Sequence, residues 1–323
     1  MKRRDFIKVG LTTLAAAPVF GAFPGGVSRA FATGKQTLKI GYLPITDHLL
    51  MIAAQQHRFE HIKLEPIKFS SWPEAAEALR AGAVDGAFLL TPIGLTLRRN
   101  GAPIKAVLLG HRNGSVITVR NGNDINSISD LKGKTIAIPS PFSTHNLLLR
   151  KVLTENGLIP DSDVRLLDMA PPEMVMALAT RRIDGFIVAE PFGAQAEAQQ
   201  VGKVLTLSKD IWNDHICCVL NLRENIINQP EIAQDLVTGL TRTAHFIQSE
   251  PDEAAQLSVR LLGQRPEIIK TVLTTPKGRI TFDSLAPTVA DFAATQNYML
   301  QFNVAREQVD LDQYLDAHFA LNA

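Results

Sequence analysis

A phrase of eleven residues occurs twice in this chain and constrains the fold more than any other feature. The copies are ALRAGAVDGAF at residues 78–88 and ALATRRIDGFI at residues 177–187, and they begin 99 residues apart. Each joins a stretch of helical periodicity to an Asp-Gly turn and then to a short apolar strand. In such a turn glycine can adopt a positive φ, and the aspartate can bond the backbone of the turn. Because this period is too long for a solenoid unit, the repeat predicts two similar α/β lobes with a cleft between them.

The first 32 residues have the pattern of an export signal. Arg3 and Arg4 are followed by an apolar pair and Lys8, as in twin-arginine signals, and Ala30-Phe31-Ala32 offers a small-x-small cleavage site. The weakly apolar stretch between them is too short for a stable membrane span, and no other segment has 18 consecutive apolar residues. We therefore expect a cleaved signal at residues 1–32 and an exported, periplasmic protein. An uncleaved anchor or a disordered tail is the alternative.

Charge and cysteine content exclude two classes of protein. Residues 1–32 hold five of the 33 basic and one of the 32 acidic residues, so the remaining chain carries a net charge of −3. This balance, without a dense basic stripe, argues against a nucleic-acid binder. The only cysteines are the adjacent Cys217 and Cys218, which excludes a disulfide framework. Two buried thiols or a strained vicinal disulfide remain open.

Strands and helices alternate from Leu38 to about Leu222, and helical periodicity dominates after Pro230. Such alternation predicts an α/β fold with mostly parallel sheets covered by helices on both faces. The expected elements include a strand at 38–42, a helix at 47–57, strands at 86–90 and 186–189, a helix at 144–156 and a C-terminal helix at 284–302.

Hydroxyl, carboxylate and proline residues gather where strands lead into helices. Ligands of open α/β sheets bind at such joints, where helix N-termini offer free N–H groups to an anion. Ordinary helix capping is the alternative for any one joint. Taken together, the joints predict a cleft for a small-molecule solute. The candidate residues at the joints are Thr46, Asp47, Ser71, Trp72, Thr91, Ser143, Thr144, His145 and Glu190.

The chain resembles solute-binding proteins of ABC importers in the nitrate/sulfonate/bicarbonate family. The matching phrases are GYLPITDHLLMIAAQQHRFE from Gly41, FSSWPEA from Phe69, VDGAFLLTPIGL from Val84, STHNLLLRKVL from Ser143, PPEMVMALATRRIDGFIVAEPFGAQ from Pro171 and IWNDH from Ile211. The resemblance implies a type II periplasmic-binding-protein fold with two α/β lobes, two hinge crossings and an interlobe cleft. It also implies a monomeric binding protein that delivers its solute to an ABC permease and ATPase at the inner membrane.

The same resemblance assigns ligand contacts, and two extended stretches that flank the second strand–helix series predict the lobe boundaries. Relatives that bind nitrate or bicarbonate contribute contacts from the positions of Trp72, Ser115, Thr144, His145 and Glu190. The chain is expected to cross between lobes near residues 115–123 and to return near 219–223. Lobe one is then residues 38–120 with 219–323, and lobe two is residues 121–218. Trp72 and His145 should face each other across the cleft.

One departure from the family leaves the solute open. These relatives carry a lysine shortly after the Trp-x-x-His phrase, where this chain has Cys217 and Cys218. Without that ammonium group, positive charge would come from helix N-termini, His145 or His215. An inorganic anion, a sulfonate, a carboxylate and an uncharged heterocycle all remain candidates, held mainly through neutral hydrogen-bond donors.

An enzyme on the same fold is the second functional class. Sulfinate desulfinases and thiamin-pyrimidine synthases resemble these binders, and His215 could activate a thiolate of Cys217 or Cys218. The chain lacks the cysteine-rich tract of those synthases and any nucleotide fingerprint, so we expect a binding protein without a cofactor. His57 and His61 have metal-ligand spacing but no third ligand nearby in sequence, so no metal site is predicted.

Overall fold

The computed structural model describes residues 34–323, so the expected export signal at residues 1–32 lies outside the described part of the chain. Within that part, no helix combines the length and apolar character needed to cross a bilayer.

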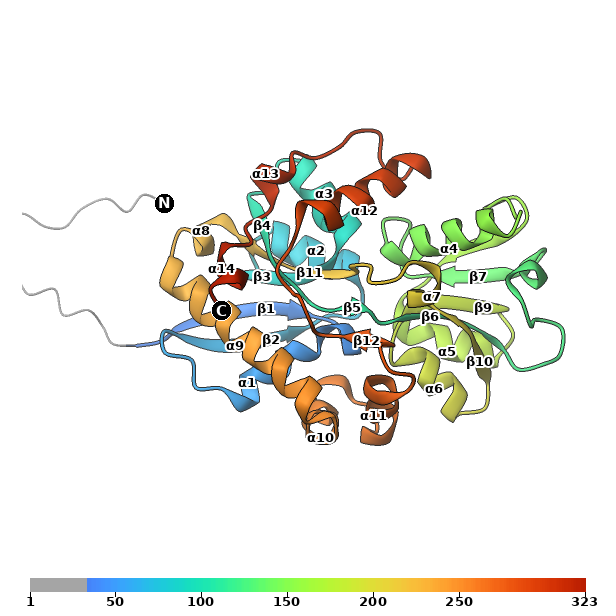
Figure 1. Ribbon diagram of the computed structural model, residues 1–323, viewed down its shortest axis with the longest axis horizontal. Helices are drawn as coiled ribbons and strands as arrows, with labels where there is room; N and C mark the ends of the chain where they lie inside the picture. Colours follow the sequence, from blue (N-terminus) through green and yellow to red (C-terminus); the bar gives the residue numbers. More distant parts are fainter. Residues whose placement is uncertain (1–33) are drawn as a thin grey trace, which may run out of the picture. The chain divides into compact units, whose positions relative to one another are not determined.

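Two five-stranded sheets organise the chain (Figure 1). The first sheet has the order β2 (Ile62–Lys68), β1 (Gln36–Tyr42), β3 (Gly86–Leu90), β11 (Cys218–Arg223), β4 (Ile104–Leu109). The second has the order β8 (Arg165–Asp168), β7 (Thr135–Ile138), β9 (Gly185–Ala189), β6 (Ser115–Arg120), β10 (Gly202–Leu207). Each sheet has one strand antiparallel to its neighbours, β11 in the first and β6 in the second. The predicted α/β class with mostly parallel sheets is therefore confirmed.

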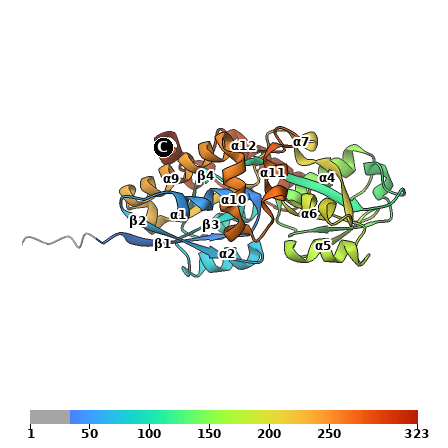
Figure 2. The same ribbon diagram turned by 90° about the horizontal axis from the view of Figure 1, so that it is seen from below.

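The helices cover both sheets. Figure 2 shows α2 on one face of the first sheet and α9 and α10 on the other. The C-terminal helices α13 and α14 contact β4, whereas α12 contacts both α3 and α4, and α11 contacts α6. The helices up to residue 198 are η1 (Thr46–Ile52), α1 (Ala53–Gln56), α2 (Trp72–Arg80), α3 (Thr91–Arg99), η2 (Ile128–Leu131), α4 (Thr144–Glu155), α5 (Pro171–Ala179) and α6 (Phe192–Ala198). The later helices are α7 (Ser208–Ile211), α8 (Glu224–Ile227), α9 (Pro230–Ser249), α10 (Pro251–Leu262), α11 (Pro266–Thr274), α12 (Val289–Gln301), α13 (Leu311–Tyr314) and α14 (His318–Leu321).

Three short segments run side by side between the two sheets. The Asn113 N–H donates to the His215 carbonyl (3.0 Å), and the Gly110 N–H donates to the Cys218 carbonyl (2.8 Å). A two-stranded ribbon joins β5 (Arg112–Asn113) to β12 (Ile280–Thr281). Because β6 pairs with β9 and β10, residues 115–120 belong to the second sheet, not to lobe one as the sequence predicts. We therefore propose that the chain crosses at residues 110–114 and returns at 208–217.

The repeated phrase occupies equivalent places in the two sheets, as α2–β3 and α5–β9. Asp85 Oδ2 accepts the Lys39 N–H (2.8 Å) and Asp184 Oδ2 accepts the Thr135 N–H (2.9 Å). Each aspartate thus ties the third strand of its sheet to the neighbouring strand β1 or β7, instead of bonding within its own turn. This shared pairing explains why the Asp recurs at the same place in both copies.

The glycines of the repeat have a different role from the one the turn predicts. Neither Gly86 nor Gly185 has a positive φ. A Cβ at Gly86 would lie 2.4 Å from Leu222 Cδ2 and 3.0 Å from the Asn221 carbonyl oxygen. A Cβ at Gly185 would lie 2.8 Å from the Thr118 carbonyl oxygen. Glycine is needed because the antiparallel strand, β11 or β6, approaches too closely for a side chain.

The helix expected at residues 47–57 is replaced by the 3-10 helix η1 and the single turn α1. His48 departs from helical geometry (φ −109°, ψ 20°), and its Nδ1 accepts the Leu43 N–H at 2.8 Å. Thr46 donates both its N–H and its hydroxyl to the Glu190 carbonyl (2.8 and 2.9 Å). These long-range and local bonds replace regular helical pairing at the start of the segment. The C-terminal helix expected from residue 284 begins at Val289, after the Thr288 side chain caps it.

Replacing either repeat glycine by alanine should destabilise the protein. We expect Gly86→Ala and Gly185→Ala each to lower the free energy of unfolding by about 1–3 kcal/mol, because the added methyl group meets the backbone of the antiparallel strand. Urea unfolding followed by circular dichroism measures this. Gly34→Ala, with no heavy atom within 4 Å of the added Cβ, is the control. Equal midpoints for all three variants would contradict the close approach.

Candidate functional site

Most of the predicted site residues meet where the two sheets approach each other. Trp72 begins α2 beside the first sheet and His145 lies in the first turn of α4 beside the second, and their ring centroids are 5.7 Å apart. Both side chains are fully buried. Ser115 Oγ lies 3.0 Å from His145 Nε2 and fixes one edge of that ring. The structure therefore brings Trp72, Ser115 and His145 together.

Thr46 and Glu190 form a contact between two structural units, the first sheet with its helices and the second sheet with its helices. The Thr46 bonds to the Glu190 carbonyl join η1 of the first unit to the end of β9 in the second. The Glu190 carboxylate pairs with Arg279 and also accepts the Ala194 N–H at 3.1 Å, in the first turn of α6. Burial raises the pKa of Glu190, and the Arg279 guanidinium opposes this. Both carboxylate oxygens are thus engaged within the protein.

Four predicted hydroxyl groups already have protein partners. The Ser71 and Ser143 side chains cap their helices by accepting the Glu74 and Asn146 N–H groups, at 3.4 and 3.0 Å. The Thr91 hydroxyl donates to the Cys217 carbonyl at 2.9 Å, which holds the returning chain against α3. The fourth group, the Thr46 hydroxyl, donates to the Glu190 carbonyl. All four hydroxyl groups therefore cap a helix or connect two chain segments.

A second group of buried polar atoms has no hydrogen-bond partner within residues 34–323. His48 Nδ1 accepts the Leu43 N–H, so its Nε2 carries the proton of the neutral ring and is left as a free donor. Burial lowers the pKa of His48 to about 3 and that of His215 to about 4, which keeps both imidazoles neutral at pH 7. The unpartnered atoms near Trp72 and His145 are His48 Nε2, Trp72 Nε1, Thr144 Oγ1, His145 Nδ1 and His215 Nε2.

Asp47 and His111 form a buried ion pair beside this group. The distance from Asp47 Oδ2 to His111 Nε2 is 3.0 Å, and both side chains have no exposed area. Burial raises the pKa of Asp47 to about 6. Burial also opposes protonation of His111, but the neighbouring Asp47 carboxylate outweighs it and raises the His111 pKa to about 10. At pH 7 the pair therefore carries opposite charges that cancel.

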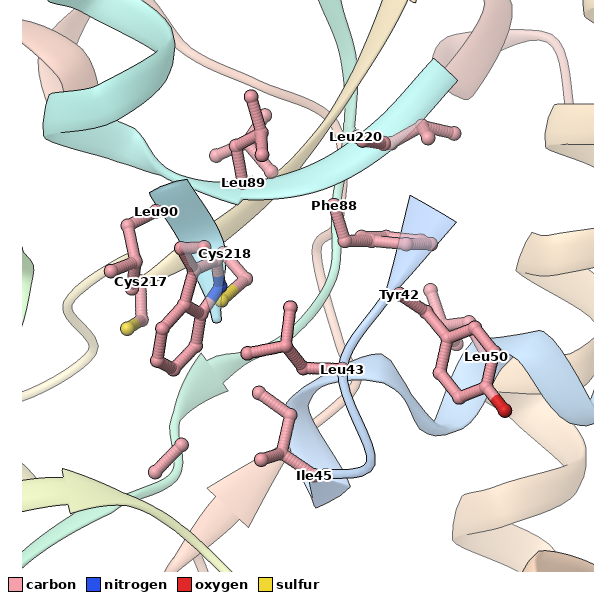
Figure 3. Close-up of a cluster of buried hydrophobic side chains, with 14 of the residues drawn as sticks. Tyr42, Leu43, Ile45, Leu50, Phe88, Leu89, Leu90, Cys217, Cys218 and Leu220 are labelled. Carbon is pink, nitrogen blue, oxygen red and sulfur yellow. The ribbon is translucent and has the colours of Figure 1, made fainter. Parts of the chain in front are cut away.

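The two cysteines are buried free thiols next to that pair. Figure 3 shows their side chains among apolar neighbours that include Leu43 and Leu90. Cys217 Sγ lies 4.0 Å from His145 Nε2, whereas His215 Nδ1 faces the Ile216 carbonyl at 3.3 Å. Burial opposes ionisation of Cys217, but Cys218, His145 and His111 outweigh it and lower the Cys217 pKa. The thiolate–His215 pair of the enzyme alternative is thus replaced by a contact with His145.

Sequence reasoning missed three buried charged or titratable residues. His48 lies in the first turn of η1, at a predicted joint that was a usable signal, whereas His111 lies between β4 and β5, where no helix begins. Arg279 lies outside every predicted joint, and only its long-range pairing with Glu190 reveals it.

One potential metal-ligand atom from each of Asp47, His111, Cys217 and Cys218 lies within 4.8 Å of the others. In contrast, His57 Nε2 bonds Thr243 Oγ1 at 3.0 Å.

Comparison with known proteins finds related importer components. The nitrate import ATP-binding protein NrtC of Synechocystis sp. PCC 6803 is 33% identical over 236 residues, which are 66% of this chain and 35% of that protein. The chain therefore spans about a third of the length of that relative.

Two solved structures share the fold. The ligand-binding component of an ABC-type import system from Staphylococcus aureus, solved with zinc bound, has a TM-score of 0.82 and 28% identity over 90% of this chain and 99% of that chain. The periplasmic nitrate-binding protein NrtA from Synechocystis PCC 6803 has a TM-score of 0.80 and 19% identity, covering 89% and 88% of the two chains. The fold is thus that of periplasmic binding proteins. Residues 32–263 match the NMT1-like family, and the chain belongs to that family.

Proposed function

We propose that the chain is the solute-binding component of an ABC importer and captures a small anion of the nitrate, sulfonate and bicarbonate class, or a related organic solute, between its two lobes. The similarity to NrtC and to two import-system binding proteins supports this class. In this proposal the twin-arginine signal exports the chain to the periplasm. There it acts as a monomer and delivers its solute to a membrane permease driven by an ATPase.

The unpartnered buried atoms around Trp72 and His145 carry the proposal. Buried polar groups in proteins are nearly always hydrogen-bonded, and an unsatisfied one costs about 1–3 kcal/mol. Here five such atoms belong to side chains from both units. A bound solute that accepts hydrogen bonds from Trp72, His48 and Thr144 would satisfy them together. This is why we place the solute at this junction.

The charges around the junction favour recognition by neutral donors. Arg279 is paired with Glu190, and His111 is paired with Asp47, so neither has a net charge to offer. His48 and His215 are neutral. An anion would therefore be held by oriented N–H and O–H groups in a dry site, where such bonds are strong.

Domain closure follows from the position of the donors on separate units. We take lobe one as residues 38–109 with 218–323 and lobe two as residues 115–207, joined by the crossing segments 110–114 and 208–217. Trp72 belongs to lobe one, and Thr144 and His145 belong to lobe two. A solute that contacts both lobes stabilises the closed arrangement through its differential affinity.

The enzyme alternative is less well supported. A nucleophilic thiolate needs access for its substrate as well as a paired base. Cys217 lies 4.0 Å from His145 Nε2 but is fully buried, and His215, the base of the alternative, bonds the backbone. Incubation with sulfinates, followed by measurement of sulfite release, tests this alternative directly. Sustained sulfite release by the wild-type protein and its loss in Cys217→Ser would support the enzyme.

A thermal-shift screen tests the solute class. We expect at least one of nitrate, bicarbonate, taurine, alkylsulfonates and small carboxylates to raise the melting temperature of the mature protein. A ligand at 100 times its Kd adds about 2.7 kcal/mol of stability. Pyrimidines and neutral sugars serve as the comparison set. Stabilisation by the neutral set alone would contradict an anion site.

Adjacent residues on α4 separate affinity from stability. We expect Thr144→Val to weaken solute binding by about ten-fold, because it removes an unpartnered hydroxyl worth about 1.4 kcal/mol to a bound acceptor. Ser143→Ala should instead lower the free energy of unfolding by about 1 kcal/mol, because it removes a helix cap. Titration calorimetry and urea unfolding measure the two effects. The reverse pattern would mean that Ser143, not Thr144, contacts the solute.

The two tryptophans allow the site to be located by fluorescence. Solute binding should change the emission of the Trp212→Phe protein, in which Trp72 is the only tryptophan. The emission of Trp72→Phe should change less, since Trp212 packs on Tyr298 and on the edge of the site at His215, with centroids 4.8 and 5.9 Å apart. Affinity in Trp212→Phe should change only a few-fold between low and physiological salt, because buried donors are weakly screened. A steep salt dependence would indicate a formal positive charge at the solute.

A further inference from the structure

We propose that Asp47, His111, Cys217 and Cys218 form a binding site for one divalent cation of the zinc class. Each residue supplies one ligand atom: a carboxylate oxygen, an imidazole nitrogen and two thiol sulfurs. These four atoms all lie within 4.8 Å of one another, and all four residues are fully buried. This inference concerns a metal ion and stands apart from the choice of solute.

The geometry is close to what a tetrahedral site needs. With zinc bonds of about 2.0–2.3 Å, the ligand atoms of a tetrahedron lie about 3.3–3.8 Å apart. The distance of 3.0 Å between Asp47 Oδ2 and His111 Nε2 is a few tenths of an ångström below that range. Because no two of the ligand atoms are more than 4.8 Å apart, a shift of about 1 Å brings the most widely separated pair into that range. Two thiolates exclude calcium and magnesium, which take oxygen ligands, and favour zinc and similar late transition metals.

Unsatisfied polar atoms give an independent reason for a cation here. Asp47 Oδ1 and His111 Nδ1 have no hydrogen-bond partner within the described residues, and Asp47 Oδ2 faces only His111 Nε2, at 3.0 Å. Asp47 is fully buried, and a buried carboxylate is costly unless it is paired or coordinates a metal. Its one charged neighbour at contact distance is His111, which belongs to the same cluster.

All four ligands belong to the first sheet or its connections. Asp47 lies in η1, His111 follows β4, Cys217 directly precedes β11 and Cys218 is the first residue of β11. The Thr91 hydroxyl holds the Cys217 carbonyl, and the Gly110 N–H holds the Cys218 carbonyl, so the backbone of both cysteines is fixed. A cation at this point joins η1 to both crossing segments. Because no ligand comes from the second sheet, the site does not require closure of the lobes.

Metal binding is tested on the mature protein, kept reduced and stripped with a chelator. We expect one equivalent of Zn²⁺ to bind, measured by competition with a chromophoric chelator and by elemental analysis after gel filtration. Cobalt should give the intense thiolate-to-metal charge-transfer absorption, which reports sulfur ligation directly. Solute binding is measured separately with and without zinc, so that failure of either proposal is recognised by itself.

Cys217→Ser and Cys218→Ser should weaken zinc binding by more than the roughly 10–100-fold that loss of an outer-shell partner costs. The matched control is His57→Gln with His61→Gln, which removes the only closely spaced histidine pair outside the cluster and should leave stoichiometry unchanged. Where a serine variant fails to fold, the cobalt spectrum of the wild-type protein decides. Absence of a stoichiometric metal, cobalt binding without thiolate absorption, or loss of binding in the histidine control would each overturn the proposal.

Discussion

The structure depends on an exchange of one strand between its two sheets. The first sheet is completed by β11, which comes after the whole second sheet in the sequence. The second sheet is completed by β6, which follows β4 of the first sheet and the short strand β5. Each exchanged strand runs antiparallel beside the third strand, β3 or β9, and passes so close that only glycine fits opposite it. Two crossing segments follow from this exchange, and they bring His111 and Cys217 to the same place.

The sequence predicts the fold well because its signals are local. Apolar runs, helix caps and the Asp-Gly repeat each report on fewer than fifteen residues, and they locate α2, β3, α5, β9 and α4. Membership of a sheet is a long-range property. The sequence of residues 115–120 predicts a strand, but it does not indicate which of the two sheets this strand joins. The same limit applies to η1, where a bond from Thr46 to the distant Glu190 replaces the predicted regular helix.

The candidate site shows the same division between local and long-range information. Trp72, Ser115 and His145 are predicted from the sequence and lie together, because joints at strand ends converge in α/β folds. Hydroxyl groups divide into those that cap a helix, such as Ser143, and those without a partner, such as Thr144, and the sequence does not separate neighbours in one turn. Arg279 and the Asp47–His111 pair depend on contacts across most of the chain, which no local pattern encodes.

The exchanged strands also have a consequence for the order of assembly. During synthesis, β1, β2, β3 and β4 are complete long before β11 emerges, so β3 and β4 have no strand between them for more than 100 residues of chain growth. The second sheet, by contrast, needs only residues 115–207. Pairing across such long separations is slow, because the chain loses the entropy of closing a long loop before any strand contact stabilises it. We therefore expect the half of the molecule that is synthesised first to fold last, with open edges at β3 and β4 that are exposed to aggregation until β11 pairs with them.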